Sequence, residues 1–332
     1  MKSLEGPDTS APVSVVMAVR DEEAHIEAAV RSVLDNGFEP GVRVVVAVGP
    51  SSDDTRQIID ALAADEPRIH VVDNPHGGTP HGLNVALAQV DTDVVVRMDG
   101  HGELPRGYIA HAVQALAQTS AANVGGRMVP EAQTPWPRAV AVAMRSKWGI
   151  GGAGHRIGGQ PGPADSVFLG VFRSAAVAEV GGFDEHFTRA QDWELNLRLR
   201  QAGYVVWFDP ALQVAYRPRG SWRALARQFY RSGQWRREVG RTHRLRPSVR
   251  YLAPPAVTVA VTAGTLLGAV GVAFAVPWLW LGWIAPAGYL AGVLVAALTL
   301  VKAAGVAAAV RMPAVLFTMH MAWGAGFLRG VR

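Results

Sequence analysis

The chain has 332 residues, of which 49% are hydrophobic and 18% charged, and its formal net charge is +5. It contains no cysteine, which excludes disulfides and thiolate metal sites. Residues 217–250 hold eleven arginines and one acid, the bias expected of a cytoplasmic segment next to a membrane span. No basic stripe lies within residues 1–200, so nucleic acid is not expected as a partner.

The first hundred residues alternate between apolar, strand-like runs and helical patterns. Strands are expected at residues 13–19, 42–48, 71–72 and 93–98, and helices at 24–34, 55–64 and 81–89. This alternation predicts an α/β domain with a mainly parallel, Rossmann-like sheet covered on both faces. Ligands of such sheets bind beyond the carboxyl ends of the strands.

The alternation is interrupted between residues 136 and 164, which are rich in glycine, proline and arginine. A mobile lid and an ordinary exposed loop are both open interpretations of this segment. The pattern then resumes with an expected strand at 167–172, helices at 175–180 and 192–200, and a short strand at 205–208.

The rest of the chain has the character of a membrane anchor. In the helical pattern of residues 222–236, Trp222 and Phe229 share one face while Arg223 and Arg227 share another, which favours an interfacial helix over packing against the soluble domain. Two spans are expected, at 252–276 and 278–301. Residues 312–328 could form a third span or a re-entrant or surface helix.

Three regions are therefore expected: a soluble domain at 1–216, basic interfacial helices at 217–250 and a transmembrane region at 251–332. The first ten residues lack the apolar core of a signal peptide. The soluble domain is accordingly expected on the cytoplasmic face of the plasma (inner) membrane.

A carboxylate and an imidazole stand together at the end of the fourth expected strand, in Asp99-Gly100-His101. Such a pair could bind a divalent cation, and the imidazole would shift the preference from Mg²⁺ towards Mn²⁺. A strand-end turn capped by the aspartate is the alternative.

Together the motifs resemble the family 2 glycosyltransferases, which have the GT-A fold and transfer sugars from nucleotide-diphospho sugars with inversion. Residues 13–23 are similar to their first strand and nucleotide-binding turn, and residues 99–101 stand at their metal motif. Residues 181–185 and 191–195 match the acceptor-side segment and the catalytic Glu-Asp of the family. With an arginine two residues before its metal motif, the sequence resembles those family members that extend exopolysaccharide repeat units on a polyprenyl-diphosphate carrier.

The resemblance implies roles for individual residues. Donor binding is expected from Ala18, Val19, Asp21, Glu22, Asp53, Arg97, Asp99 and Arg127. The acceptor or diphosphate side is expected to use Gly182, Asp184, Gln191, Trp193, Glu194, Gln228, Arg231 and Trp235. Asp99 and His101 would hold the metal, Mn²⁺ or Mg²⁺.

Asp192 is the candidate catalytic base, because a position near a helix N-terminus favours an ionised carboxylate. A helix N-cap is its alternative role. After its second strand the family usually has acidic residues that bind the base of the nucleotide. This chain has residues 48–51 at that place, which leaves Asp53 as the nearest acid. The glutamine–arginine–tryptophan motif of processive synthases is incomplete, so we expect one sugar to be added per encounter.

The expected function is that of a membrane-anchored, metal-dependent inverting hexosyltransferase. It would move a sugar from a nucleotide-sugar donor such as a UDP-hexose to a polyprenyl-diphosphate-linked saccharide, in exopolysaccharide or cell-envelope glycan synthesis. Membrane lipid and other glycan-assembly proteins are the further expected partners. A polyprenyl-phosphate sugar synthase and a non-catalytic nucleotide-sugar-binding subunit are the alternatives.

Overall fold

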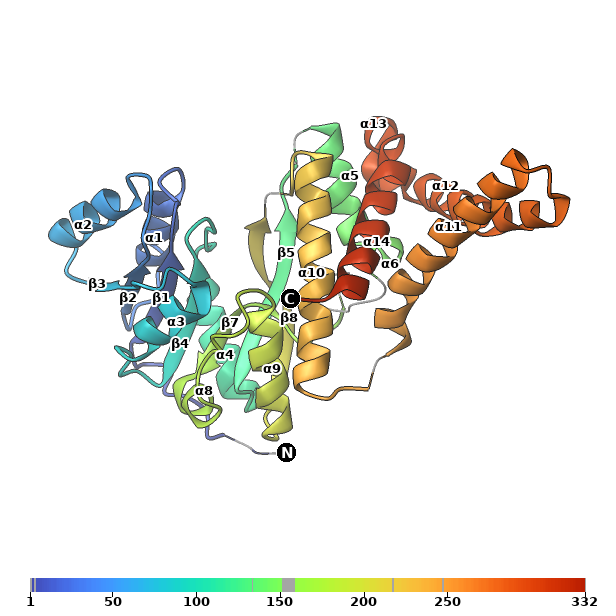
Figure 1. Ribbon diagram of the computed structural model, residues 1–332. Coiled ribbons are helices and arrows are strands. Elements are labelled where there is room, and N and C mark those ends of the chain that lie inside the picture. Colours follow the sequence, from blue (N-terminus) through green and yellow to red (C-terminus); the bar gives the residue numbers. More distant parts are fainter. Residues whose placement is uncertain are drawn as a thin grey trace. The chain divides into compact units, whose positions relative to one another are not determined.

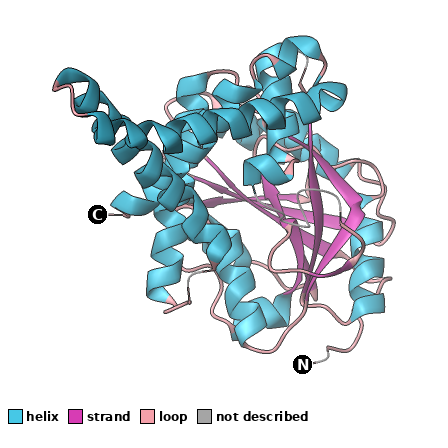
Figure 2. Ribbon diagram, turned by 90° about the vertical axis from the view of Figure 1, so that its right-hand side faces the viewer, coloured by secondary structure: helices cyan, strands magenta, loops and turns pink. Residues whose placement is uncertain are grey.

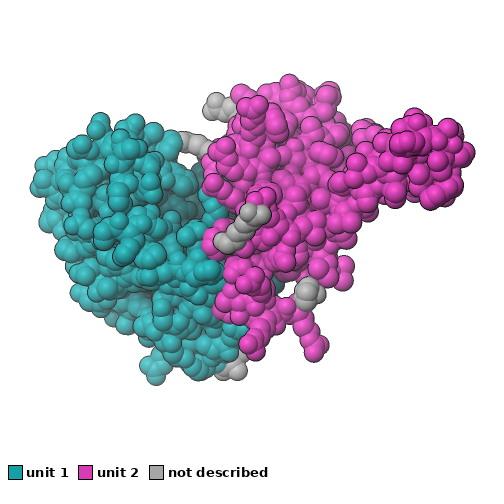
Figure 3. All heavy atoms as spheres, in the orientation of Figure 1, with its two compact units in different colours: residues 1–129, 154–216 teal, residues 130–153, 217–332 magenta. Residues whose placement is uncertain are grey.

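The computed structural model describes residues 2, 4–132, 134–150, 159–216, 218–246 and 248–331. The chain divides into two compact units, shown in different colours in Figure 3. The first consists of Met1–Val129 and Gly154–Tyr216, and the second of Pro130–Ala153 and Arg217–Arg332.

The first unit is built on a sheet whose described strands follow the order β3-β2-β1-β4-β7-β5-β8-β6 (magenta in Figure 2). The strands are β1 (Val13–Val19), β2 (Val42–Val48), β3 (Ile69–Asp73), β4 (Val94–Asp99), β5 (Asn123–Pro130), β6 (Gly162–Pro163), β7 (Phe168–Arg173) and β8 (Val206–Tyr216). Strands β1 to β4 run parallel, whereas β7 is antiparallel to both β4 and β5. The α/β class is thus confirmed, with an antiparallel extension at one side.

Helices cover both faces of this sheet, as predicted. One hydrophobic cluster joins the sheet to α1 (Ile26–Leu34), α2 (Thr55–Asp65) and α4 (Tyr108–Thr119). The other joins it to α3 (Thr79–Leu87), α8 (Ser174–Glu179) and α9 (Gln191–Gln201). Alternate side chains of β1 enter the two clusters, Val15 and Met17 the first and Val16 the second, because successive residues of a strand face opposite sides.

The prediction of a loop or lid between residues 136 and 164 is wrong for residues 136–150, most of which are helical. Residues there form α5 (Pro135–Met144) and α6 (Lys147–Ile150). Proline at the start of α5 is compatible with a helix, since the first turn needs no amide donor, and an alanine- and valine-rich run follows it. The glycine-rich residues 151–158 lie outside the described part of the chain.

Besides α5 and α6, the second unit contains one arginine-rich helix and several apolar helical segments. The arginine-rich helix is α10 (Trp222–Thr242), and the apolar segments are α11 (Val249–Ala273), the 3₁₀ helix η1 (Pro277–Trp283), α12 (Ile284–Ala304), α13 (Val306–Ala309) and α14 (Met312–Arg329) (Figure 1). Within the described residues, three segments are long and apolar enough to cross a membrane: Val249–Ala273, Pro277–Ala304 and Val306–Arg329. The first two correspond to the predicted spans, and Trp278, Trp280 and Trp283 lie exposed in η1.

Helices α10 and α14 lie against each other within this unit, and α14 also packs on α11, α12 and α5. Leu225 and Phe229 of α10 are buried, while Arg223, Arg227 and Arg231 are exposed on its other side. The apolar face of α10 is therefore largely covered by protein. Its placement at a membrane surface stays a prediction.

Candidate active site

The parallel strands β1 and β4 lie side by side at the point where the strand order reverses. From β1 the chain proceeds outward to β2 and β3, and β4 then returns to the opposite side of β1, with Ala18 paired to Asp99. A crevice outside the carboxyl ends of two such strands is where open α/β sheets bind ligands. Of the predicted site residues, Ala18, Val19, Arg97 and Asp99 lie on these two strands near this point.

Arg97 joins two of the predicted carboxylates. Its side chain, which points from β4 and is 5% exposed, donates from Nη2 to Oδ1 of Asp99 at 2.6 Å. Its Nη1 forms a second ion pair, with Oδ2 of Asp192 at the start of α9. The structure thus brings Arg97, Asp99 and Asp192 together, although Arg97 was expected to contact the donor.

Asp192 does not cap α9. The N-cap is Ala190, in the left-handed conformation with φ of 62°, and Asp192 lies in the first turn, so the alternative role as N-cap is wrong. Burial raises the pKa of Asp192 above its ordinary value, although the charge of Arg97 opposes that rise. The raised pKa suits a general base, because the carboxylate retains an abstracted proton more readily.

The two carboxylate oxygens of Asp192 have different surroundings. Oδ2 is bound by Arg97, while Oδ1 is buried and has no hydrogen-bond partner within the described parts of the chain. Buried polar atoms are nearly always paired, so an unpaired carboxylate oxygen calls for an explanation. A substrate hydroxyl that donates to Oδ1 would supply the missing bond.

The two predicted metal ligands both have protein partners. Nδ1 of His101 lies 2.7 Å from Oε1 of Glu22, and Asp99 is paired with Arg97 through Oδ1. The described residues contain no group of three or more histidine, aspartate or glutamate side chains that could hold a metal by themselves. A cation held by Asp99 and completed by substrate phosphates and water still fits, since Mg²⁺ is commonly bound in that way and Asp99 is 27% exposed.

The acidic turn after β1 is tied to the loop after β2. Oδ1 of Asp21 accepts from the amide of Ser52 at 2.8 Å, and Oδ2 of Asp53 accepts from the amide of Glu23 at 3.1 Å. Oδ1 of Asp53 accepts from Thr55. These carboxylates therefore brace the two loops against each other, and Asp53 has no oxygen left unbonded.

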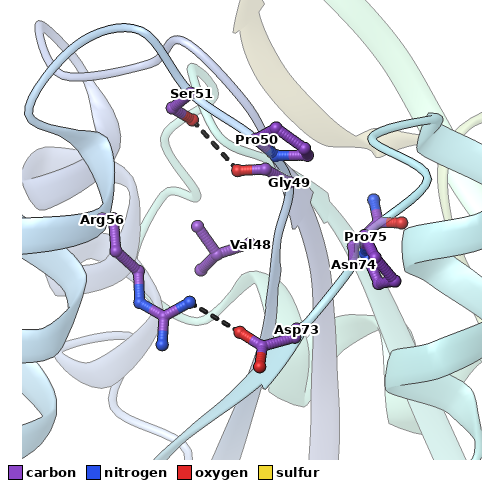
Figure 4. Close-up of a pocket in the computed structure, with 8 residues that line it drawn as sticks. All are labelled: Val48, Gly49, Pro50, Ser51, Arg56, Asp73, Asn74 and Pro75. Carbon is purple, nitrogen blue, oxygen red and sulfur yellow. Dashed lines mark hydrogen bonds and ion pairs between the residues drawn. The ribbon is translucent and has the colours of Figure 1, made fainter.

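A pocket of about 420 Å³ opens beside these loops, beyond the ends of β2 and β3 (Figure 4). It is lined by Val48, Gly49, Pro50, Ser51, Arg56, Asp73, Asn74 and Pro75. The acid in this lining is Asp73, which Nη1 of Arg56 holds at 2.6 Å. The role expected of Asp53 stays a prediction. The signal that could have found Asp73 was its position directly after the apolar residues of the third strand.

The segment Gly182–Asp184 is held from two sides. The side-chain amide of Asn84 donates to the carbonyl of Phe183 and accepts from its N–H, both at 2.8 Å. Arg198 donates to the carbonyl of Gly182 at 2.7 Å. Gly182 has φ of 71°, and a Cβ there would lie 2.8 Å from Oδ1 of Asn84, so glycine is required. Asn84 and Arg198 thus fix the backbone of this segment, and neither was predicted from the sequence to do so.

Glu194 forms a buried ion pair with Arg198. Its carboxylate is fully buried and accepts two bonds from Arg198, at 2.6 and 2.7 Å. A carboxylate so paired is not exposed to an acceptor. The spacing of the pair, four residues apart on one helix, was visible in the sequence.

The remaining predicted residues have simpler surroundings. Ala18 and Val19 end β1, Arg127 is half-buried on β5, and Gln191 and Trp193 lie in the first turn of α9. The acceptor-side residues from the second unit all belong to α10: Gln228, Arg231 and Trp235. Their proposed contact with a diphosphate stays a prediction.

Comparison with known proteins decides the family. The sequence profile of Glycosyl transferase family 2 matches residues 14–177. The chain is also 33% identical over 336 residues to the succinoglycan biosynthesis protein ExoA of Rhizobium meliloti (strain 1021), a match that covers 97% of this chain and 95% of that protein. The chain belongs to glycosyl transferase family 2.

Other glycosyltransferases are similar to the chain over different lengths. A pre-mycofactocin glycosyltransferase of Mycobacterium tuberculosis is 27% identical over 208 residues, 61% of this chain and 42% of that protein. The mannosyltransferase PcManGT from Pyrobaculum calidifontis, solved in complex with GDP-Man and Mn²⁺, has a TM-score of 0.58 at 19% identity, covering 96% of this chain and 89% of that one. This likeness is one of fold and confirms the GT-A architecture.

Proposed function

We propose that the chain is a membrane-anchored, inverting hexosyltransferase that moves a sugar from a nucleotide-diphospho sugar to a polyprenyl-diphosphate-linked saccharide. The observation that carries the proposal is the free, buried oxygen of Asp192, held by Arg97 beside Asp99 at the switch point of the sheet. The likeness to ExoA along nearly the whole chain supports an acceptor of the exopolysaccharide class, and UDP-hexose is the proposed donor.

In the proposed reaction Asp192 accepts the proton of the acceptor hydroxyl at Oδ1, while Arg97 holds Oδ2 and fixes the direction of the carboxylate. The acceptor oxygen forms a bond to the anomeric carbon as the bond from that carbon to the diphosphate breaks on the opposite face, which inverts the configuration. A divalent cation at Asp99, Mn²⁺ or Mg²⁺, supplies positive charge for the leaving diphosphate.

The pocket beyond β2 and β3 is the proposed place of the nucleotide base. Val48, Pro50 and Pro75 give it apolar surface, and the Arg56–Asp73 pair stands within the same lining, as Figure 4 shows. Ligand sites of this kind combine apolar walls with a few fixed polar groups. The loops braced by Asp21 and Asp53 would then lie between the base and the diphosphate.

The direct test is a transfer and hydrolysis assay of the purified protein in detergent, with several nucleotide sugars and with Mn²⁺ or Mg²⁺. We expect turnover of one donor class, and we expect Asp99→Asn to lower kcat about 100-fold or more, because an oxyanion-type stabilisation of that size is lost. Asp91→Asn is the matched control, since Asp91 precedes β4 at its other end and makes only a 3.4 Å surface pair with Arg43. Equal activity of Asp99→Asn and wild type would contradict the proposal.

For the membrane region we propose that α11 and α12 cross the inner membrane as a hairpin, with η1 on the far side, and that α14 stays on the cytoplasmic side. Helix α14 is in backbone contact with α10, whose exposed arginines would be costly in hydrocarbon. A green fluorescent protein fused after residue 332 should fluoresce, and alkaline phosphatase inserted in η1 should be active. A dark C-terminal fusion with active phosphatase at the same position would show that α14 spans.

A further inference from the structure

Arg97 is an unusual residue for its place in the sheet. It interrupts the apolar run of β4, a central strand whose neighbouring residues Val95, Val96 and Met98 are all buried. Its Nε is buried without a hydrogen-bond partner among the residues that the structure describes. The guanidinium is thus held by its two ion pairs, with Asp99 on its own strand and with Asp192 on α9.

The two partners have different tasks in the proposed reaction. Asp99 would bind the cation and Asp192 would accept the proton, so one buried positive charge is shared between the metal side and the acceptor side of the site. A guanidinium can bond two carboxylates at once through separate nitrogens, which a lysine ammonium at the same place could not do with the same geometry. Without this charge the two carboxylates would face each other across a low-dielectric region and repel.

We propose that Arg97 is a positioning residue that competes with the divalent cation for Asp99 and, when the cation takes that carboxylate, holds Asp192 more firmly for the acceptor. The inference rests on the proposed function. Oδ1 of Asp99 accepts the bond from Nη2 of Arg97, so a cation that approaches Asp99 meets a carboxylate already partly neutralised. Loss of that bond leaves Asp192 as the principal partner of the guanidinium, whose positive charge then acts mainly on that one carboxylate.

The test is a titration of the full-length protein in detergent with Mn²⁺ at a fixed concentration of UDP, whose phosphates complete the proposed site. Electron paramagnetic resonance measures the free ion, and a protein-free UDP blank is subtracted. Asp99→Asn should abolish saturable binding. Arg97→Met should bind Mn²⁺ about tenfold more tightly than wild type, because no charge-assisted bond has to be broken. Asp192→Asn should bind it several-fold more weakly, since Arg97 then has Asp99 as its only charged partner. Arg43→Met, which removes a surface arginine of β2, is the matched control and should leave Mn²⁺ binding unchanged.

The turnover of Arg97→Met should fall about 100-fold or more even as its Mn²⁺ affinity rises, because Asp192 loses its anchor. A residue that merely stabilised the fold would lower both. Should Arg97→Met fail to fold, the double variant Arg97→Met/Asp192→Asn is compared with Asp192→Asn, so that no unpaired Asp192 is present. The inference would be overturned by equal Mn²⁺ affinities of wild type and Arg97→Met, or of Asp192→Asn and the double variant. If Asp99→Asn instead bound Mn²⁺ as tightly as wild type, the proposed metal site would be overturned.

Discussion

Asp192→Asn is expected to lower kcat by about 100- to 10,000-fold, the range found when a positioned general base is lost. Asparagine has nearly the same shape, so the contact with Arg97 can persist through the amide oxygen, but the side chain no longer accepts the proton of the acceptor hydroxyl. The donor KM should change no more than several-fold. Steady-state kinetics with the donor found by the screen, at saturating Mn²⁺, measure both quantities.

Asp165→Asn is the matched control for this variant. Asp165 is 68% exposed and reaches the same helix α9 through Arg200 at 3.2 Å, so its loss removes a carboxylate near α9 without touching the site. Its kcat should stay near wild type. If Asp192→Asn retained high activity, the acceptor would need no base, and a lipid phosphate, which is already ionised, would replace the saccharide hydroxyl as the acceptor.

The parallel half of the sheet could be predicted because each of its strands is a compact apolar run that ends in a polar loop. β5 and α4 were missed, and β8 was predicted as a much shorter strand. β5 contains Gly125 and Gly126, which lower strand propensity but are needed there, since a Cβ on Gly126 would lie 1.6 Å from the carbonyl oxygen of Leu212. Such a strand is specified by the packing of its neighbours, which local pattern does not reveal.

In the site, too, features set by the local sequence were predicted, and features set by contacts between distant residues were not. Asp99 was found because it directly follows a buried strand, and Asp192 because it begins a helical pattern. The link between them through Arg97 was not predicted, because Arg97 and Asp192 are 95 positions apart in the sequence. The raised pKa of Asp192 was missed for a related reason, since burial depends on the fold while a helix N-terminus is visible in the sequence.

Gly326→Ala is expected to lower the free energy of unfolding by about 3 kcal/mol or more, at or above the usual cost of overpacking. A Cβ at this position of α14 would lie 1.9 Å from the carbonyl oxygen of Tyr230 on α10, and backbone atoms cannot give way as a flexible side chain can. Thermal unfolding in detergent measures the effect. Gly292→Ala in α12 is the control, because nothing lies within 4 Å of its Cβ, and alanine there should be neutral or stabilising by up to about 1 kcal/mol.

Gly233→Ala tests the same contact from the other helix. Its Cβ would lie 2.1 Å from the carbonyl oxygen of Trp323, so either alanine must push α10 and α14 apart. Once one substitution has separated the helices, the second has less contact to break, and the double variant should lose clearly less stability than the sum of the two single variants. Additive losses, or a Gly326→Ala protein as stable as the Gly292→Ala control, would show that the two helices are not in backbone contact.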